Sequence, residues 1–366
     1  MNMESASKSD NLAIKQSNNL YVHFPFCRRK CSYCALYSRA GVSQADRDAY
    51  VRRLAQEIGA ECPTPRAKLK TVYFGGGSPA LCDLSVLAPS LRPLCGEETE
   101  FTVELHPLDV TPDKLNQLKA LGVNRISMGV QSLDDGVLAD MGRGYTVDEA
   151  ERAFALVKRY FDNASIDLIV GYLGDEVKVE GEQWNLHRLR SWGLKHCSVY
   201  SLQNERGLKN VPDDDVVMDR IRHFAKCLES MGLERYEISN YAVPGFECRH
   251  NFAVWRGEDY IGLGDGACGR IGFRRTFSTG ASFVIGTSEH PTIRPRVDVV
   301  SPSQDQIERR IFRLRTREGL DASGCPEWEQ ILHKYVQEGL LTREGMIYRL
   351  TERGMEVCDS ILAELV

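Results

Sequence analysis

The sequence predicts an α/β protein built on an incomplete parallel barrel of six strands, followed by a smaller and mostly helical domain. Short β-branched or aromatic runs alternate with helical patterns of 10–15 residues over more than half of the chain, which is typical of βα units on a parallel sheet. Six such runs in roughly 180 residues are too few to close a barrel of eight strands. A doubly wound sheet is the alternative.

The predicted barrel elements follow one another in a regular order. The six strands are expected over residues 20–24, 71–74, 100–104, 125–130, 165–170 and 196–200. Helices are expected between them over residues 46–61, 111–121 and 146–160. Thr146 is followed three residues later by Glu149, the spacing of a capping box, so the third helix is expected to begin there.

The rest of the chain has a different pattern. Residues 235–270 are rich in glycine and aromatics without a helical period, and residues 280–303 indicate a loop-rich connector. Beyond them, helices over 303–314, 326–338 and 351–365 surround a hairpin over 341–350 that turns at Glu344 and Gly345. The predicted domains are a flexible N-terminal arm (1–19), a partial barrel (20–234), a Gly/aromatic-rich region with connector (235–302) and a winged-helix-like domain (303–366).

Composition limits the class of function. The chain has 366 residues and a net charge of −5, which argues against a nucleic-acid-binding surface even though winged-helix modules often bind DNA. No run approaches the ~18 apolar residues of a membrane span, and residues 1–19 lack the apolar core of a secretory signal. We therefore expect a cytoplasmic protein, whose 12 cysteines do not form a disulfide framework and include metal ligands.

Three of the cysteines lie close together directly after the first predicted strand. Cys27, Cys31 and Cys34 form the pattern C-x3-C-x2-C. Zinc sites usually take four ligands from two C-x2-C pairs, and no second pair lies nearby. Three thiolates on a [4Fe–4S] cube leave one iron open for the amine and carboxylate of a substrate. The pattern therefore favours an open cluster, and the basic residues 28–30 are expected to lower the pKa of the thiols.

The cysteine motif with Tyr33 before its last cysteine is similar to that of the radical S-adenosylmethionine (SAM) superfamily. Five segments resemble the group that contains anaerobic coproporphyrinogen III oxidase and the HemW haem chaperones: YVHFPFC (21–27), FGGGSP (74–79), VELHP (103–107), GVQS (129–132) and IDLIVG (166–171). The resemblance extends from about residue 20 to the C-terminus. It implies that an electron from a reduced cluster cleaves SAM to methionine and a 5′-deoxyadenosyl radical. The protein's part is then to bind and orient the reacting groups and to exclude side reactions.

The resemblance also implies a set of SAM-binding residues: Tyr21, Tyr33, Gly76, Gly77, Ser78, Glu104, Gln131, Arg143 and Asp167. Some of these positions are unusual in themselves. The three glycines let the backbone approach a ligand closely, with a tight turn as the alternative. Glu104 ends a strand, where site residues of a barrel lie. Asp167 is mid-strand, where a carboxylate needs a partner, and a buried arginine or backbone amide is the alternative to a ligand.

A second site is implied by the stretch around His250, which resembles the H-N-x-x-Y-W pattern that HemW proteins carry in connection with haem binding. On this resemblance His250 is an axial haem ligand and Trp255 packs on the porphyrin, while Val254 replaces the tyrosine. A hydrogen-bonded structural histidine is the alternative for His250. Cys268 stands where relatives have histidine. Both it and Cys248 are expected to be buried and inert, with a thiolate ligand to the haem iron as the alternative for either.

Two features favour the haem chaperones over the oxidase. Leu36 stands in place of a fourth cysteine, and 26 residues precede Cys27. We therefore expect a haem chaperone that binds haem, a [4Fe–4S] cluster and SAM and delivers haem to haem-requiring proteins such as membrane respiratory enzymes. A flavodoxin-type electron donor and a second copy of the chain are further expected partners. The alternatives are a radical-SAM enzyme that decarboxylates coproporphyrinogen III or transfers methyl groups, and a scaffold that keeps the cluster without turnover.

Overall fold

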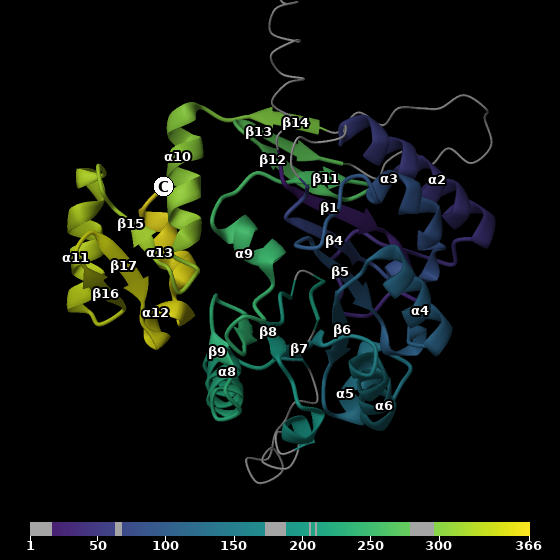
Figure 1. Ribbon diagram of the computed structural model, residues 1–366. Helices are drawn as coiled ribbons and strands as arrows, with labels where there is room; N and C mark the ends of the chain where they lie inside the picture. Colours follow the sequence, from purple (N-terminus) through teal and green to yellow (C-terminus); the bar gives the residue numbers. More distant parts are fainter. Residues whose placement is uncertain (1–16, 63–67, 173–187, 205, 209–210, 279–295) are drawn as a thin grey trace, which may run out of the picture.

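The central feature of the computed structural model is a strongly curved sheet with helices along its outer side (Figure 1). The structure describes residues 17–62, 68–172, 188–204, 206–208, 211–278 and 296–366, so most of the predicted N-terminal arm lies outside the described residues. The six predicted strands are all present and lie side by side in chain order: β1 (Asn19–Phe24), β4 (Thr71–Gly76), β5 (Glu100–Leu105), β6 (Arg125–Gln131), β7 (Asn163–Val170) and β8 (His196–Ser201). Neighbours among them pair in parallel, as an incomplete barrel requires.

The sheet is wider than six strands, because three further strands lie within residues 234–263, where no strand was predicted. β11 (Ile261–Leu263) pairs in parallel with β1 at one edge. At the other edge β10 (Asn240–Ala242) pairs antiparallel with β8, and β9 (Glu234–Arg235) pairs antiparallel with β10. These strands have two or three residues each, too few to show a hydrophobic period in the sequence.

The outer helices confirm the predicted ones and add shorter elements. The longer helices are α2 (Gln44–Glu61), α4 (Pro112–Leu121), α6 (Val147–Lys158) and α8 (Asp214–Glu229). The shorter ones are η2 (Pro79–Leu81), η3 (Leu84–Leu87), α3 (Ala88–Leu91), η4 (Pro107–Asp109) and α5 (Asp135–Met141). Thr146 caps α6 and forms the predicted capping box with Glu149.

The two faces of each barrel strand differ in polarity. In β1, Leu20, Val22 and Phe24 are fully buried in the core beneath the helices, whereas Tyr21 and His23 lie on the other face. The same alternation puts polar side chains on the inner face of the neighbouring strands: Thr71, Tyr73, Thr102, Glu104, Arg125, Ser127, Ser165, Asp167, His196 and Ser198. The curved sheet therefore encloses a polar interior.

Residues 235–302 are more regular than their sequence predicted. A short helix, α9 (Arg249–Trp255), lies where no helical pattern was seen, between the barrel and the C-terminal domain (Figure 1). Three strands form a separate antiparallel sheet: β12 (Cys268–Ile271), β13 (Arg274–Phe277) and β14 (Arg296–Val299). The prediction of a loop-rich connector over 280–303 is thus wrong at β14, while residues 279–295 lie outside the described residues.

The C-terminal region consists of helices around the predicted hairpin. It contains α10 (Pro302–Arg313), β15 (Leu320–Asp321), η5 (Pro326–Trp328), α11 (Glu329–Gln337), β16 (Leu341–Glu344), β17 (Ile347–Leu350), α12 (Glu352–Glu356) and α13 (Cys358–Glu364). β16 and β17 meet at Gly345, whose φ is +62°. Trp328, Tyr335 and Tyr348 belong to a core separate from that of the barrel. Among the described residues no helix is long and apolar enough to cross a membrane.

Candidate functional site

The cysteine loop leaves the carboxyl end of β1 and returns beside its own start. β2 (Phe26–Cys27) pairs in parallel with β3 (Arg39–Ala40), so the ends of the loop are held together. Cys27, Cys31 and Cys34 are all partly exposed. Ser32 anchors the middle of the loop, because its amide donates to the carbonyl of Met141 (3.3 Å) and its hydroxyl contacts that of Tyr172 (2.7 Å). The three thiols thus lie on one anchored loop at the end of the barrel.

The surroundings of the thiols differ from the sequence prediction. Burial raises the pKa of Cys27, whereas a hydrogen bond from Ser38 and the charge of Arg143 lower it. The prediction that residues 28–30 lower the pKa of the thiols is therefore wrong for Cys27. One of those cations, Arg28, forms an ion pair with Asp109 instead (2.5 Å).

No three histidine, cysteine, aspartate or glutamate side chains converge on a single ion anywhere in the described part of the chain. This does not conflict with a cubane cluster. Thiolates that hold a [4Fe–4S] cube bind different iron atoms, so their sulfurs need not meet at one point.

Arg143 joins the cysteine loop to the barrel. Its Nη2 donates to the carbonyl of Gly129 on β6 (2.6 Å), and its Nη1 lies 3.5 Å from Cys31 Sγ and 3.4 Å from the Tyr33 hydroxyl. Burial opposes the charge of Arg143, but Tyr145, Tyr33 and Cys31 raise its pKa above the usual value. A fixed positive charge therefore lies beside the thiols, supplied by a residue more than a hundred positions away in sequence.

The glycines at the end of β4 fit around the carboxylate of Glu104. The amide of Gly76 donates to Glu104 Oε2 (3.0 Å), and the hydroxyl of Tyr73 donates to Oε1 (2.9 Å). A Cβ on Gly75 would lie 2.8 Å from Oε1 and would displace the Glu104 carboxylate, and the φ of +104° at Gly76 favours glycine there. Burial, together with the charge of Asp167, raises the pKa of Glu104 to about 7.

Gly77 and Ser78 support the start of the cysteine loop. Their amides donate to the carbonyls of Phe24 (2.7 Å) and Phe26 (2.6 Å), and a Cβ on Gly77 would lie 2.4 Å from the Phe26 carbonyl oxygen. The Ser78 hydroxyl donates to Asp109, the same carboxylate that binds Arg28. In this structure Ser78 therefore makes a protein contact that connects β4 with the loop.

Gln131 and Tyr21 complete the predicted residues near the end of the barrel. Gln131 has a φ of +73°, the only non-glycine in the left-handed region among the described residues. The pairing of β6 with β7 shifts register between Gly129 and Gln131, which indicates a bulge. Strained backbone of this kind concentrates at functional sites. The Tyr21 hydroxyl contacts His23 Nδ1 (3.0 Å) on the inner face of β1.

Asp167 accepts hydrogen bonds from hydroxyl groups. A buried arginine and a backbone amide were the alternatives considered from the sequence, and across the residues that the structure describes neither is its hydrogen-bond partner. The Ser127 hydroxyl lies 3.1 Å from both carboxylate oxygens of Asp167. Burial raises the pKa of Asp167, while the serine hydroxyls and the charge of Arg125 lower it. Ser127, Ser165 and Arg125 were missed as site residues. The sequence did contain a signal for them, because they occupy alternate positions of two predicted strands and so lie on the same face of the sheet as Asp167.

His250 lies at the opposite end of the strands from the cysteine loop. Its ring is 4% exposed, its Nδ1 contacts Thr71 Oγ1 (2.8 Å), and it packs 5.2 Å from the ring of Tyr73. Burial lowers the pKa of His250 to about 3, so the ring is neutral. In this conformation His250 makes the structural hydrogen bond that was its alternative role, and the ring is closed to a ligand as large as haem.

Trp255 does not share a surface with His250. Its ring packs against Phe312 of α10 (6.3 Å), and the guanidinium of Arg315 lies 5.1 Å from its centre. Cys248 is buried, as expected, but Cys268 is exposed, which corrects the prediction. It opens β12 opposite the exposed Phe277 and lies near enough to Tyr21 and Tyr260 for its charge to raise their pKa values.

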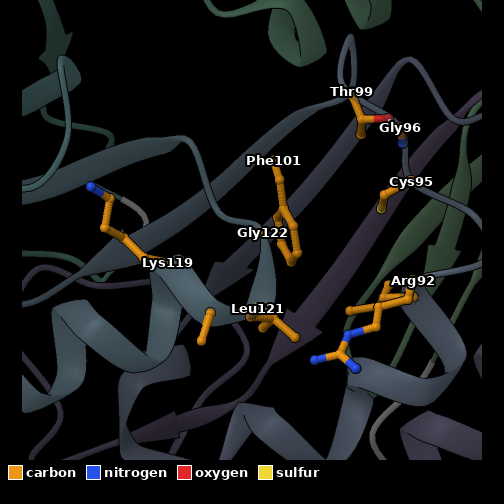
Figure 2. Close-up of a pocket in the computed structure, with 10 residues that line it drawn as sticks. Arg92, Cys95, Gly96, Thr99, Phe101, Lys119, Leu121 and Gly122 are labelled. Atoms are coloured by element: carbon orange, nitrogen blue, oxygen red, sulfur yellow. Dashed lines mark hydrogen bonds between the residues drawn. The ribbon is translucent and has the colours of Figure 1, made fainter.

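A hollow of about 310 Å³ lies elsewhere, outside the barrel near the amino end of β5. Figure 2 shows Phe101, Leu121 and Cys95 along it, with Arg92 and Lys119 at its rim. None of the predicted site residues lines it, so we do not assign the functional site there.

Comparisons with known proteins agree with the motifs. Residues 21–178 match the Radical SAM superfamily. The heme chaperone HemW of Bacillus subtilis is 30% identical over 94% of this chain and 99% of that protein, and HemW of Escherichia coli is 33% identical over 75% of this chain and 74% of that protein. The solved structure of coproporphyrinogen III oxidase (HemN) from Escherichia coli, described as a radical SAM enzyme, superposes with a TM-score of 0.80 at 21% identity, covering 98% of this chain and 93% of that one.

Proposed function

Because this chain belongs to the HemW family of the radical SAM superfamily, we propose that it is a cytoplasmic haem chaperone that delivers haem to haem-requiring proteins. The observation that carries the proposal is the match to a curated haem chaperone along nearly its whole length. Leu36 supports it, because this exposed side chain provides no fourth thiol at the end of the cysteine loop.

Membership in the superfamily implies a [4Fe–4S] cluster and SAM, and the residues present fit both. Cys27, Cys31 and Cys34 would hold the cluster from one anchored loop. When bound, the cluster and SAM supply one-electron reductive chemistry. The chain's own contribution is to bind and orient: the glycines leave room beside Glu104, and Arg143 offsets the negative charge of the cluster.

The proposed SAM site is the carboxyl end of the barrel. SAM is a cation with an additional amino and carboxylate group, so it suits a surface that offers both signs of charge. Glu104 and Asp167 would face its positive groups and Arg143 its carboxylate. The remaining proposed contacts come from Tyr21, Tyr33, Gly76, Gly77, Ser78 and Gln131.

For haem, the proposed site is α9, with His250 as axial ligand and Trp255 as a packing surface. Because the ring of His250 is enclosed by Thr71 and Tyr73, ligation requires α9 to move away from the barrel. The proposed haem acceptors are respiratory membrane enzymes. The proposed electron donor is a flavodoxin-type protein, and a second copy of the chain is a further proposed partner.

The chaperone function is tested by transfer. The cluster is reconstituted anaerobically, haemin is added, and visible spectra are recorded before and after mixing with a haem-free acceptor protein. We expect the haem spectrum to move from this chain to the acceptor. Coproporphyrinogen III, added in place of haemin with SAM and a reductant, is expected to remain unchanged. Formation of protoporphyrinogen at ordinary turnover would contradict the chaperone function.

The haem ligand is tested separately with His250→Ala. We expect this variant to lose at least tenfold in haemin affinity, measured by difference spectroscopy. His223→Ala, which removes an exposed histidine from α8, is the matched control and should bind as the parent does. Equal affinity of His250→Ala and the control would remove His250 from the haem site.

A further inference from the structure

Arg125 is a buried cation with an incomplete set of partners. Its side chain is 1% exposed, and its Nε has no hydrogen-bond partner. Nη2 donates to the Ser165 hydroxyl at 3.2 Å. By contrast, the buried Arg270 is paired directly with Asp305 at 2.9 Å. Within the described ranges no carboxylate forms an ion pair with Arg125, although the charge of the nearby Glu100 raises its pKa. A buried charge is costly unless it is compensated, so the partners that Arg125 does have are informative.

From Arg125 a chain of hydrogen bonds leads across two strands to Asp167. Ser165 Oγ lies 2.8 Å from Ser127 Oγ, its register partner on β6. Ser127 Oγ lies 3.1 Å from each oxygen of Asp167. A guanidinium can only donate and an ionised carboxylate can only accept. With Asp167 ionised, the direction of the chain is fixed: Arg125 donates to Ser165, Ser165 to Ser127, and Ser127 to Asp167.

We propose that Arg125, acting through Ser165 and Ser127, is a positioning residue that keeps Asp167 ionised and in one orientation for binding the cationic part of SAM. The proposal rests on the SAM site proposed above. Serial hydrogen bonds polarise one another in a low-dielectric interior, and donors to a carboxylate favour its charged form. A cation at one end of the chain thus stabilises an anion at the other without touching it.

The groups that face Asp167 explain why it needs this support. Arg125 from β6 and Arg143 after α5 lower its pKa, whereas burial raises it. Glu104 from β5 is the nearby carboxylate, and the charge of Asp167 raises the pKa of Glu104. Tyr73 from β4 and the residues Cys197, Ser198 and Tyr200 from β8 complete its surroundings. Because two carboxylates share this interior, we expect Asp167 to become protonated more readily when a neutral residue replaces Arg125.

The test combines Arg125→Met, Ser165→Ala and Asp167→Asn in the cluster-reconstituted full chain. SAM binding is measured by calorimetry between pH 6 and 9. We expect Arg125→Met to raise the pH of half-maximal affinity by about one unit, which corresponds to an affinity about tenfold weaker at pH values below both midpoints. Ser165→Ala should change both in the same direction by less. Ser191→Ala, an exposed hydroxyl on the outer surface, is the matched control.

A double-mutant cycle separates positioning from a general structural effect. In the Asp167→Asn background, Arg125→Met should have little further effect on SAM affinity. Equal losses in both backgrounds would overturn the proposal, and Ser165→Ala in the same two backgrounds provides the cycle if Arg125→Met does not fold.

The state of Asp167 is also followed without SAM. Infrared difference spectra detect its protonated carboxyl band, which is assigned by its loss in Asp167→Asn. We expect the protonated band to disappear at a pH about one unit higher in Arg125→Met than in the parent. The same titration midpoint in both would overturn the proposal, whereas a parent that titrates as expected but fails to bind SAM would contradict only the proposed function.

Discussion

At the scale of single residues, Glu104 is a buried carboxyl whose charge changes near neutral pH. Burial and the charge of Asp167 raise its pKa from 4.5 to about 7, against hydrogen bonds from Tyr73 and Gly76. The folded protein therefore holds one more proton than the unfolded chain between these two pH values. Protonated Glu104 therefore adds to the free energy of unfolding. This contribution is fully present below pH 4.5 and is lost as the pH rises through about 7.

Glu104→Gln should remove this pH dependence. We expect the free energy of unfolding of the parent to fall relative to that of the variant by about 2–3 kcal/mol as the pH rises from 4.5 to 8, as a shift of this size implies. Urea titrations of the cluster-free proteins at several pH values measure the difference. Glu97→Gln changes an exposed carboxyl and should follow the parent. Parallel curves for parent and Glu104→Gln would contradict the expected titration.

At the scale of elements, α9 depends on a side chain from the barrel. Its N-cap residue, Cys248, provides no side-chain hydrogen bond. Instead the carboxylate of Glu100, at the start of β5, accepts from the amides of Arg249 and His250, both at 3.0 Å. A helix of seven residues has little stability of its own, so this contact and the His250–Thr71 hydrogen bond fix where α9 lies.

Glu100→Ala should loosen α9 from the barrel. The two amides lose a charged acceptor, and a buried donor left unsatisfied costs about 1–3 kcal/mol. We therefore expect the free energy of unfolding to fall by about 2–4 kcal/mol. Hydrogen exchange should accelerate, relative to the parent, more at the amides of Arg249 and His250 than at other amides. Glu98→Ala, a neighbouring exposed change, should leave both unaltered. Unchanged exchange at α9 in Glu100→Ala would show that the carboxylate does not hold the helix.

The dependence of α9 on Glu100 also explains which elements were predictable. The six barrel strands and α6 carry their signals locally, in alternating apolar residues and in the Thr146 cap. α9, β10 and β11 are short and obtain their hydrogen bonds from distant segments. Their own residues therefore show no hydrophobic period from which they could be predicted. The site divides in the same way: spacing within eight residues identifies the three cysteines, whereas the contact of Arg143 with Cys31 exists only in the folded chain.

At the scale of the whole molecule, ion pairs join the C-terminal domain to the rest of the chain. Asp305 of α10 accepts from Arg270 of β12 (2.9 Å), Arg275 of β13 (2.7 Å) and Arg309 of its own helix (2.6 Å). Figure 1 shows α10 between the small sheet and the rest of the C-terminal domain. Further pairs also join this domain to the rest of the chain: Arg309–Asp259 and Arg256–Glu318 to the region before α10, and Arg222–Glu356 to α8 of the barrel.

Asp305→Ala should weaken this attachment. Breaking a buried ion pair costs about 3–5 kcal/mol, and we expect about 3 kcal/mol because Glu308 still lies 3.5 Å from Arg270 and 2.7 Å from Arg275. Urea unfolding measures the loss, and limited proteolysis should release the C-terminal domain sooner. Glu344→Ala, which removes an exposed pair with Arg349, should change stability by less than about 1 kcal/mol. Equal effects of the two substitutions would contradict the assigned role.

The same network predicts the response of the parent to acid. Although burial opposes it, hydrogen bonds from Arg309, Arg275 and Arg270 lower the pKa of Asp305 from 3.8 to about 2. A carboxyl with a lowered pKa contributes stability that is present above its ordinary value and is lost as the pH falls through the folded one. We therefore expect the difference in stability between the parent and Asp305→Ala to shrink as the pH falls from 4 to 2. A difference that stayed constant over this range would mean that Asp305 does not hold α10 through its charge.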